Sequence, residues 1–436
     1  MSQELSREEI VRLDRARVWH PYTAMDEFAA KDPIVVTSAK GARLQDADGR
    51  SYLDGNSSWF VATLGHAHPR LVARVKAQVE ELAHCALAGI AHEKAALLAD
   101  ALCRIAPEGL TRAFFTDDGS TAVEVALKIA VQYWQQSRAP RKTRFVALDG
   151  AFHGDSIGAA SLGGVEIFRR PFGAILFDCV HVPLPDEDGY ARAFEAVSRL
   201  VREESDTLAG VVVEPIVQAS AGMRVYDPGY LKELHELTRK HDVLFIVDEV
   251  FTGYGRTGPM WASTRAGVLP DMMCVGKAMS PFLPMGATLA TDRVQDAFRG
   301  PKSRALMYGH TLCGNPLGAA LALEVLDVYR DERVLEEAVP KALRIEQAFE
   351  RIRSRSGVTA TRSIGMIGAA DLGGAGGNGG YLGGLGWRVY EEARLRGAYL
   401  RPLGDTVYVT PPLTIDDADL DTLLAIVEES IIALGA

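Results

Sequence analysis

The sequence predicts an α/β fold with a largely parallel sheet covered by helices on both faces, and a second, smaller α/β region. From about Leu71 onward, helical patterns alternate with short apolar runs, and strands separated by helices are typical of parallel sheets. These runs are Arg112–Thr116, Arg144–Leu148, Gly210–Glu214, Val243–Asp248 and Met272–Val275. A second group of strand candidates follows near the end of the chain, at Ile364–Asp371, Ala398–Arg401 and Thr406–Thr410.

The chain of 436 residues is too long for one typical hydrophobic core, so we expect two domains. The segment Ile34–Gly55 predicts β-hairpins, with turns at Gly41 and at Asp48-Gly49. A long helical pattern begins after Pro316 and is interrupted only at Pro340. We therefore expect a large central domain over residues 66–325 and a smaller domain built from residues 1–65 and 326–436.

One stretch, Gly373 to Gly386, is so rich in glycine that it has few side chains to pack. We expect it to form a mobile surface loop.

Composition excludes several classes of protein. Apolar residues make up 47% and charged residues 24% of the chain, as in ordinary globular proteins, and the net charge of -10 argues against nucleic-acid binding. Five scattered cysteines without a CxxC pair indicate reduced thiols, and no apolar run approaches the roughly 18 residues needed to cross a membrane. We expect a cytoplasmic protein. His66, His68 and Cys85 lack the second ligand pair of a zinc site, so no metal is expected.

The stretch from Leu244 to Gly258 places Asp248 and Glu249 directly after a buried strand. A carboxylate there must reach water or find a cationic partner, because burying an unpaired charge is costly. Gly253–Gly258 matches G-x-G-x-x-G, but Pro259 follows and no helix begins, so a dinucleotide-binding loop is rejected.

A lysine follows the next apolar run, at Gly276-Lys277. Because ligands of open α/β sheets bind outside the carboxyl ends of the strands, Asp248 and Lys277 are expected to face one crevice. The alternative is a solvated surface lysine.

A helical pattern begins at Gly119-Ser120, where free backbone N–H groups and the helix dipole would favour a phosphate. The alternative is ordinary N-capping by Ser120.

Pyridoxal phosphate requires all three of these features. Its aldehyde forms a Schiff base with a lysine, its ring nitrogen stays protonated beside a carboxylate, and its phosphate needs N–H donors. The protonated cofactor would then be the cationic partner of Asp248.

With these residues in place, the sequence resembles the class III (ω-amino) aminotransferases of the fold-type I pyridoxal-phosphate superfamily. The likeness is collinear from about Trp19 to Pro412. It is carried by Asp248-Glu249-Val250 with GYGRTG, Gly276-Lys277, Asp117-Asp118-Gly119-Ser120, Phe152-His153-Gly154, Glu214-Pro215, and Gly309-His310-Thr311 with Gly314-Asn315-Pro316. The resemblance implies a seven-stranded, mostly parallel sheet in the large domain and a homodimer with shared active sites.

The same resemblance implies roles for single residues. Lys277 would carry the Schiff base and Asp248 would hold the ring nitrogen. The other residues implied to bind the cofactor are Gly119, Ser120, Phe152, His153, His310 and Thr311, with Thr311 donated from the other subunit of a homodimer. The residues implied to bind substrate are Tyr22, Trp59, Phe152, Lys277, Gly309 and Arg401.

Within the class, the sequence is similar to the members that convert 8-amino-7-oxononanoate to 7,8-diaminononanoate in biotin synthesis. The marks are Trp19–Thr23, Ser57–Phe60, Ile216-Val217-Gln218 and Arg401–Gly404. This likeness implies a ping-pong transamination in which Arg401 binds the carboxylate of the acceptor. The implied amino donor is S-adenosyl-L-methionine, but Gly309-His310 is similar to the forms that use lysine, so both donors stay open.

Several departures and alternatives accompany the resemblance. Phe152 replaces the usual tyrosine, and Asp118 adds a carboxylate where relatives carry serine, so we expect its side chain to point away from the phosphate. Tyr22 and Trp59 could be core or interface aromatics, Arg401 could pair with Asp405, and Glu214 could only anchor a loop. The rival functions are a broader ω-aminotransferase, a pyridoxal-phosphate-dependent aminomutase and a non-catalytic binding protein.

Overall fold

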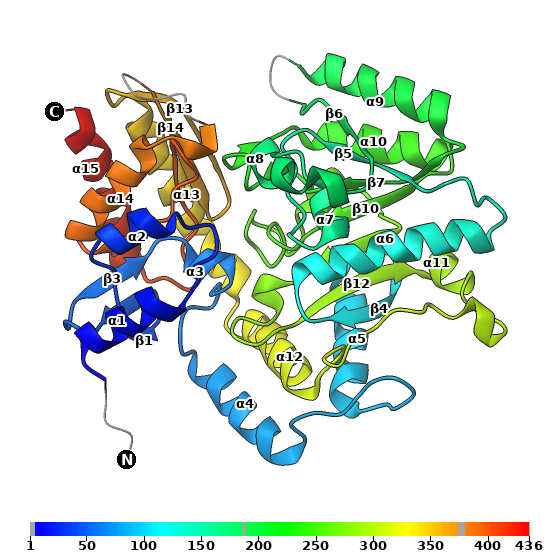
Figure 1. Cartoon of the computed structure of the whole chain (residues 1–436), viewed down its shortest axis with the longest axis horizontal. Helices are drawn as coiled ribbons and strands as arrows, with labels where there is room; N and C mark the ends of the chain where they lie inside the picture. Colours follow the sequence, from blue (N-terminus) through cyan, green and yellow to red (C-terminus); the bar gives the residue numbers. More distant parts are fainter. Residues whose placement is uncertain (1–4, 186–188, 374–379, 436) are drawn as a thin grey trace.

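The computed structural model describes residues 5–185, 189–373 and 380–435. The chain forms two lobes (Figure 1): the middle of the chain builds the larger one, and both ends of the chain build the smaller one, where both termini lie.

A seven-stranded sheet is the centre of the larger lobe. Its order is β4-β12-β11-β10-β7-β5-β6, and β12 is antiparallel to both of its neighbours, whereas the other pairs are parallel. The strands are β4 Leu110–Thr116, β5 Arg144–Leu148, β6 Cys179–Val182, β7 Leu208–Val213, β10 Leu244–Asp248, β11 Met272–Val275 and β12 Gly286–Thr291. The predicted mostly parallel, seven-stranded sheet is confirmed.

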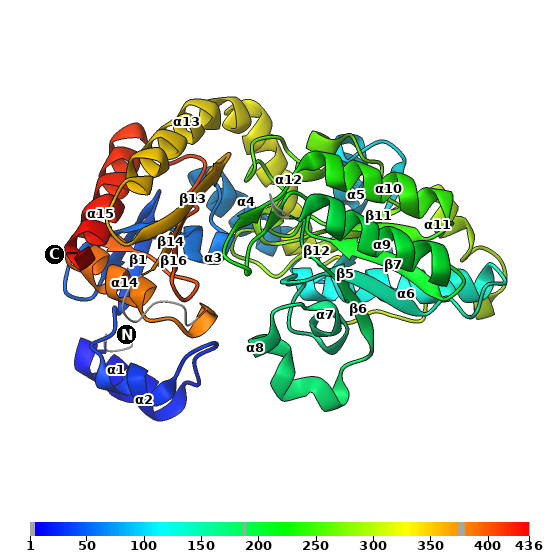
Figure 2. The ribbon, with the colours of Figure 1, turned by 90° about the horizontal axis from the view of Figure 1, so that it is seen from above.

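Helices cover both faces of this sheet (Figure 2). On β10, Leu244 and Ile246 pack with the apolar side of α6 (Gly119–Gln136), whereas Phe245 and Val247 pack with that of α10 (Pro228–Lys240). Alternate residues of one strand thus serve two cores, which explains why β10 has an apolar run without polar alternation.

The smaller lobe contains two sheets that explain its dependence on both chain ends. The first has the order β1-β2-β3-β15 and joins the N-terminal strands to a C-terminal one, and the second has the order β13-β14-β16. The strands are β1 Val36–Lys40, β2 Arg43–Asp46, β3 Ser51–Asp54, β13 Val358–Ile364, β14 Ile367–Leu372, β15 Ala398–Tyr399 and β16 Thr406–Val409. The predicted α/β region made from both chain ends is therefore confirmed.

The remaining elements complete the two lobes. The helices are α1 Arg7–Arg17, α2 Met25–Ala30, α3 Ser57–Phe60, α4 Pro69–Glu81, α5 Glu93–Ile105, α7 Ile157–Leu162, α8 Glu166–Arg169, α9 Tyr190–Glu204, α11 Asp292–Asp296, α12 Pro316–Asp331, α13 Val334–Arg353, α14 Leu385–Leu395 and α15 Asp417–Gly435. A short hairpin pairs β8 Val217–Gln218 with β9 Arg224–Val225.

Two predictions about the C-terminal half are wrong. The helical pattern after Pro316 breaks at Glu332-Arg333, where Arg333 has a left-handed φ of 50°, and Pro340 lies inside α13. The predicted strand Ile364–Asp371 is the end of β13, a turn at Gly365 and most of β14, because a glycine with a φ of 53° reverses the chain there.

Because α12 runs across residue 325, we propose that the C-terminal domain boundary lies nearer Arg333, and we keep residue 65 as the proposed N-terminal boundary. In the glycine-rich stretch, residues 374–379 lie outside the described residues, whereas a 3₁₀ turn at Gly380–Leu382 and the start of α14 follow them. Among the described residues, no helix is both long and apolar enough to cross a membrane.

Candidate active site

The carboxyl ends of β10 and β11 bring Asp248 and Lys277 to one cavity. The two strands pair in parallel with Asp248 opposite Cys274, and Lys277 follows three residues later. Both residues line a cavity of about 590 Å³, and Asp248 is only 4% exposed. The lysine is therefore not a solvated surface residue.

Glu249 has a different place from its neighbour Asp248. It is 1% exposed, and its carboxylate accepts hydrogen bonds from the N–H groups of Ala262 and Ser263 (3.1 and 2.7 Å) and from the hydroxyl of Thr252 (2.6 Å). Burial raises its pKa. Glu249 thus anchors the glycine-rich turn, whereas Asp248 faces the cavity.

The Lys277 amine is in an environment that disfavours its charge. Burial lowers its pKa, although the carboxylates of Asp248 and Glu214 oppose that shift. Its backbone has a φ of 45°, which is unusual for a residue with a side chain, and its Nζ lies 5.5 Å from the ring centroid of Phe60.

Asp248 is oriented by two hydrogen bonds. Its Oδ2 lies 2.8 Å from Nδ1 of the buried His153, and its Oδ1 accepts from the N–H of Val250 at 3.0 Å. Although burial opposes the charged imidazole, the hydrogen bond to Asp248 raises the pKa of His153. Each carboxylate oxygen has a further lone pair for a cationic ligand.

Glu214 lines the same cavity and anchors two loops. Its carboxylate accepts hydrogen bonds from the N–H groups of Phe152 (3.0 Å) and Ala219 (3.1 Å), so Glu214 fixes the backbone beside His153. Burial raises its pKa to about 7.

The start of α6 forms another part of the cavity wall, where both Gly119 and Ser120 lie. The helix is capped by Asp118 and not by Ser120, since the Asp118 carboxylate accepts from the N–H of Thr121 at 2.7 Å. This carboxylate is turned onto its own helix. The N–H groups of Gly119 and Ser120 precede the first intrahelical donor and are suited to an anion.

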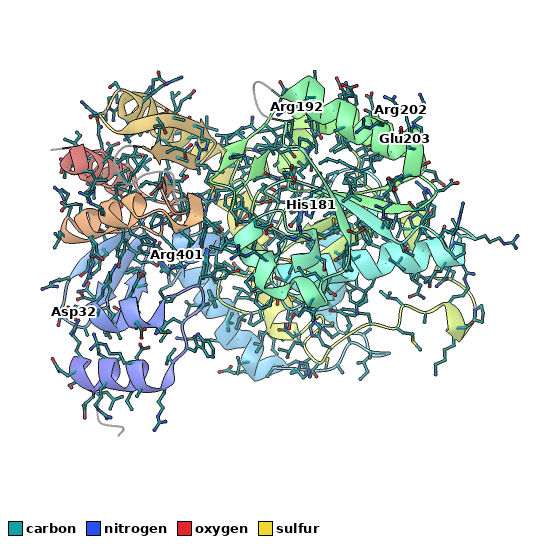
Figure 3. All side chains as sticks on the ribbon, turned by 45° about the horizontal axis from the view of Figure 1, so that its top comes forward. Asp32, His181, Arg192, Arg202, Glu203 and Arg401 are labelled. Atoms are coloured by element: carbon teal, nitrogen blue, oxygen red, sulfur yellow. The ribbon has the colours of Figure 1, made fainter. Side chains whose placement is uncertain are left out.

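Arg401 and two aromatic residues form the wall that belongs to the smaller lobe. The Arg401 guanidinium lies 4.7 Å from the ring centroid of Trp59 and 3.4 Å from the carbonyl oxygen of Tyr22, and the Tyr22 and Trp59 rings meet edge to face. Figure 3 labels Arg401 on the side of the smaller lobe that faces the larger one. Arg401 lines the cavity, and the carboxylate of Asp405, which the sequence offered as its alternative partner, accepts a hydrogen bond from the N–H of Leu385.

The cavity residues that the sequence analysis did not name include Asp155, Phe168 and Tyr381. Asp155 accepts a 2.6 Å hydrogen bond from the Tyr22 hydroxyl, and Phe168 contacts the rings of Phe152 and Tyr381. Asp155 directly follows Phe152-His153-Gly154, which is a signal that could have been used. Nothing in the sequence around Phe168 or Tyr381 indicates a site.

The structure does not bring every predicted residue to this cavity. Phe152 and His153 line it, but the described residues that line it do not include Gly309, His310 or Thr311. Nε2 of His310 lies 3.3 Å from Oδ1 of Asp117, and both Gly309 and Thr311 are exposed.

The cavity fits the chemistry of pyridoxal phosphate. It combines a partly buried lysine of lowered pKa, a buried carboxylate, and a helix start with free N–H groups. Gly154 has a φ of 124°, and a Cβ there would collide with Ser120, so the backbone approaches this helix start more closely than a larger residue would allow.

Comparison with known proteins agrees with this geometry. The family model of aminotransferase class III matches residues 25–431. The chain is 37% identical to the adenosylmethionine-8-amino-7-oxononanoate aminotransferase of Geobacter sulfurreducens, with 96% of each protein covered. The crystal structure of the enzyme of the same name from Methanocaldococcus jannaschii has a TM-score of 0.93 at 31% identity, covering 98% of this chain and 99% of that one.

An amine transaminase from an uncultivated Pseudomonas species, solved in its PLP-bound form, has a TM-score of 0.89 at 30% identity, covering 96% of this chain and 99% of the other. The family thus implies a pyridoxal-phosphate-type cofactor and small-molecule substrates, as the resemblance predicts. The chain belongs to the class III aminotransferase family.

Proposed function

We propose that this protein transfers an amino group to 8-amino-7-oxononanoate to give 7,8-diaminononanoate, with pyridoxal 5′-phosphate as cofactor and S-adenosyl-L-methionine as amino donor. The observation that carries the proposal is that Lys277 and Arg401, from different lobes, line one cavity of about 590 Å³. The full-length likeness to enzymes named for this reaction supports it.

The residues that would hold the cofactor are Lys277, Asp248, Gly119 and Ser120, with Phe152 and His153 beside them. When bound, pyridoxal phosphate supplies an electron sink for the carbon that bears the substrate amine. Asp248 would keep positive charge at the far end of that sink, and His153 would keep the Asp248 carboxylate in place.

Lys277 is suited to move a proton. Because burial lowers its pKa, a larger share of its amine is neutral near pH 7 than for an exposed lysine, so it can act first as base and then as acid. Its Nζ would take a proton from the donor's carbon and return it elsewhere in the same site.

Arg401 is suited to the acceptor. A guanidinium binds a carboxylate with two parallel hydrogen bonds, and 8-amino-7-oxononanoate ends in a carboxylate. The Trp59 ring holds the Arg401 guanidinium, and the apolar rings of the wall would contact the acceptor's alkyl chain.

The carboxylate of Asp155 in the cavity wall favours a donor that carries positive charge. Adenosylmethionine and lysine both carry positive charge, so the lysine-dependent reaction is the second candidate.

We further propose that Gly309, His310 and Thr311 act at the site of a second subunit in a homodimer, in the cytoplasm. The exposure of Gly309 and Thr311, and the position of all three residues outside the described wall of their own chain's cavity, support this assignment.

A half-reaction experiment tests the function. The cofactor-loaded protein is mixed with S-adenosyl-L-methionine or lysine alone, and the loss of cofactor absorbance is followed; 8-amino-7-oxononanoate is then added and its recovery is measured. We expect adenosylmethionine to drive the first step and the acceptor to drive the second. If neither donor changes the spectrum, the proposed function is wrong.

Arg401→Ala separates the two steps. We expect this variant to keep the donor step within about threefold and to lose the acceptor step by about 100-fold or more, because the proposed role of the guanidinium is to bind the acceptor's carboxylate. Arg388→Ala, which removes an exposed arginine of the same lobe, is the matched control and should change neither step. A broader ω-aminotransferase would keep its activity on simple amines in both variants.

A further inference from the structure

The residues Ser57 to Phe60 form a left-handed helical turn, which we call the left-handed turn. All four have positive φ, at 48°, 45°, 67° and 75°, although none is glycine. The turn is hydrogen-bonded like a helix, from the N–H of Phe60 to the carbonyl of Asn56 and from that of Val61 to the carbonyl of Ser57, both at 2.9 Å. Such runs of L-residues persist only where their surroundings fix them.

The left-handed turn presents two aromatic rings to two basic side chains of the cavity, Arg401 and Lys277. The ring of Trp59 lies under the Arg401 guanidinium, and the next ring, Phe60, lies near Lys277. Phe60 is also held by its own packing against Phe251 and Tyr408, whereas Trp59 is 40% exposed. The placement of Trp59 therefore depends most on the turn.

One fully buried carboxylate fixes this turn. Asp54 has no exposed surface, and its Oδ1 accepts from the N–H of Asn56 at 3.2 Å, while its Oδ2 accepts from the Ser58 hydroxyl at 2.8 Å. Nε2 of His66 lies 2.8 Å from the same Oδ2. The backbone of His66 is bonded independently to Gly41, so its side chain can be changed without freeing the segment.

A second link joins the turn to Arg401 directly. The side chain of Asn56 accepts from the backbone N–H of Arg401 at 2.5 Å and donates to the carbonyl of Tyr408 at 3.2 Å. The segment that Asp54 orders thus also fixes the backbone of Arg401.

We propose that Asp54 and His66 are positioning residues for the acceptor subsite: they hold the left-handed turn, and through it the stacked pair of Trp59 and Arg401. This inference rests on the proposed function only in naming the acceptor as the substrate affected; the positioning of Trp59 can be measured without any substrate.

The test uses the full-length, cofactor-loaded protein and the variants His66→Leu and His66→Gln. The control is His68→Leu, because His68 also pairs with a carboxylate, Glu332 at 3.4 Å, and has a similar side-chain exposure, but lies outside the turn's hydrogen bonds. The quenching of Trp59 fluorescence by acrylamide is measured. The contribution of the other tryptophans is removed by subtracting the fluorescence of the same variant that also carries Trp59→Phe.

We expect His66→Leu to raise the quenching constant of Trp59 at least about twofold and the KM for 8-amino-7-oxononanoate about tenfold, with the donor half-reaction within about threefold of wild type. His66→Gln keeps an N–H for Asp54 and should restore both values toward wild type, and His68→Leu should change neither.

Unchanged quenching in His66→Leu would overturn the proposal. An equal slowing of the donor and acceptor steps, together with a loss of thermal stability, would also overturn it, because Asp54 and His66 would then contribute to folding only. If the wild-type protein has no acceptor step, the proposed function is wrong. The quenching result alone then still decides whether Asp54 and His66 position Trp59.

Discussion

Asp248 and Glu249 are adjacent acidic residues in different environments, because their side chains contact different groups. Glu249 is surrounded by N–H and hydroxyl donors of its own loop, whereas Asp248 meets one histidine and a cavity. A structural anchor and the proposed ligand of a cationic cofactor therefore carry the same chemical group, one residue apart on the two sides of a strand end.

Replacing Asp248 tests its charge. Asp248→Asn keeps the size and the acceptor for Val250 but removes the negative charge, so we expect kcat to fall about 100-fold or more, in the range seen when one preorganised electrostatic group is lost. Asp271→Asn is the control, since Asp271 is a partly buried carboxylate directly before the neighbouring strand that accepts from the N–H of Phe245, and neither residue lines the cavity. A comparable loss of kcat in both variants would contradict the role of Asp248.

Glu214 predicts a specific dependence of stability on pH. Its pKa of about 7 in the folded protein lies above its ordinary value of 4.5, so its contribution to stability is complete below about pH 4.5 and is lost as the pH rises toward 7. Glu214→Gln cannot ionise and has lost one acceptor at every pH. We therefore expect the variant to be less stable than wild type near pH 5 and to close this gap by up to roughly 3 kcal/mol near pH 8.

Thermal unfolding of wild type and Glu214→Gln from pH 5 to pH 8 measures this change. A gap that stays constant from pH 5 to pH 8 would show that Glu214 is already ionised in the folded protein.

At the scale of single elements, the start of helix α6 combines a side-chain cap with the proposed phosphate site. Asp118 caps the helix through the N–H of Thr121, which leaves the N–H groups of Gly119 and Ser120 for an anion but also places a carboxylate beside them. The family's usual serine at this position would cap the helix without the charge.

Asp118→Asn retains a good cap and removes the charge. We expect the affinity for pyridoxal phosphate to rise about two- to fivefold at low salt, corresponding to the ~0.3–1 kcal/mol of one charge at a helix end. Equilibrium titration of the apoprotein measures the change, and 0.5 M salt should reduce it. Weaker binding by the variant would show that Asp118 assists the cofactor.

Elements with long apolar runs could be predicted from the sequence, and elements fixed by tertiary contacts could not. The run before Asp248 predicts β10 because both of its faces are buried, but Gly286–Thr291 (β12) has small and polar residues and reads as a loop. The left-handed turn has no local signal at all. At roughly 1–2 kcal/mol per residue it opposes local preference, and tertiary contacts offset this cost: the buried Asp54 accepts from the Ser58 hydroxyl, and the Ser57 hydroxyl donates to the carbonyl of Thr410 at 2.6 Å.

At the scale of the whole molecule, the cavity is assembled from distant parts of the chain. Asp248 and Lys277 could be predicted to meet because strand ends converge in a parallel sheet. Tyr22 and Arg401 were expected in the site from resemblance alone, since no spacing rule relates the two chain ends. Tyr381 could not be predicted, because its position depends on the packing of its ring against Phe168.

Arg256 joins the two lobes from the inside. It is 1% exposed, burial lowers its pKa to about 10, and its guanidinium donates to the carbonyl of Pro411 at 2.8 Å and to that of Met366 at 3.4 Å. Arg256→Lys cannot reach both acceptors, so we expect a loss of about 1–3 kcal/mol in the free energy of unfolding.

Urea unfolding measures this loss, and Arg265→Lys is the control, because Arg265 is only partly buried and donates to the carbonyl of Thr257 alone. Equal destabilisation by both substitutions would argue against a special role of Arg256 between the lobes.

The parallel pairing of β3 with β15 has a consequence for biosynthesis. Residues 51–54 leave the ribosome hundreds of residues before their neighbour at 398–399 exists, so the nascent N-terminal hairpins carry an open edge for most of translation. A chaperone that shields growing polypeptides should therefore protect this segment longest, and a ribosome stalled shortly before codon 398 should expose it to proteases.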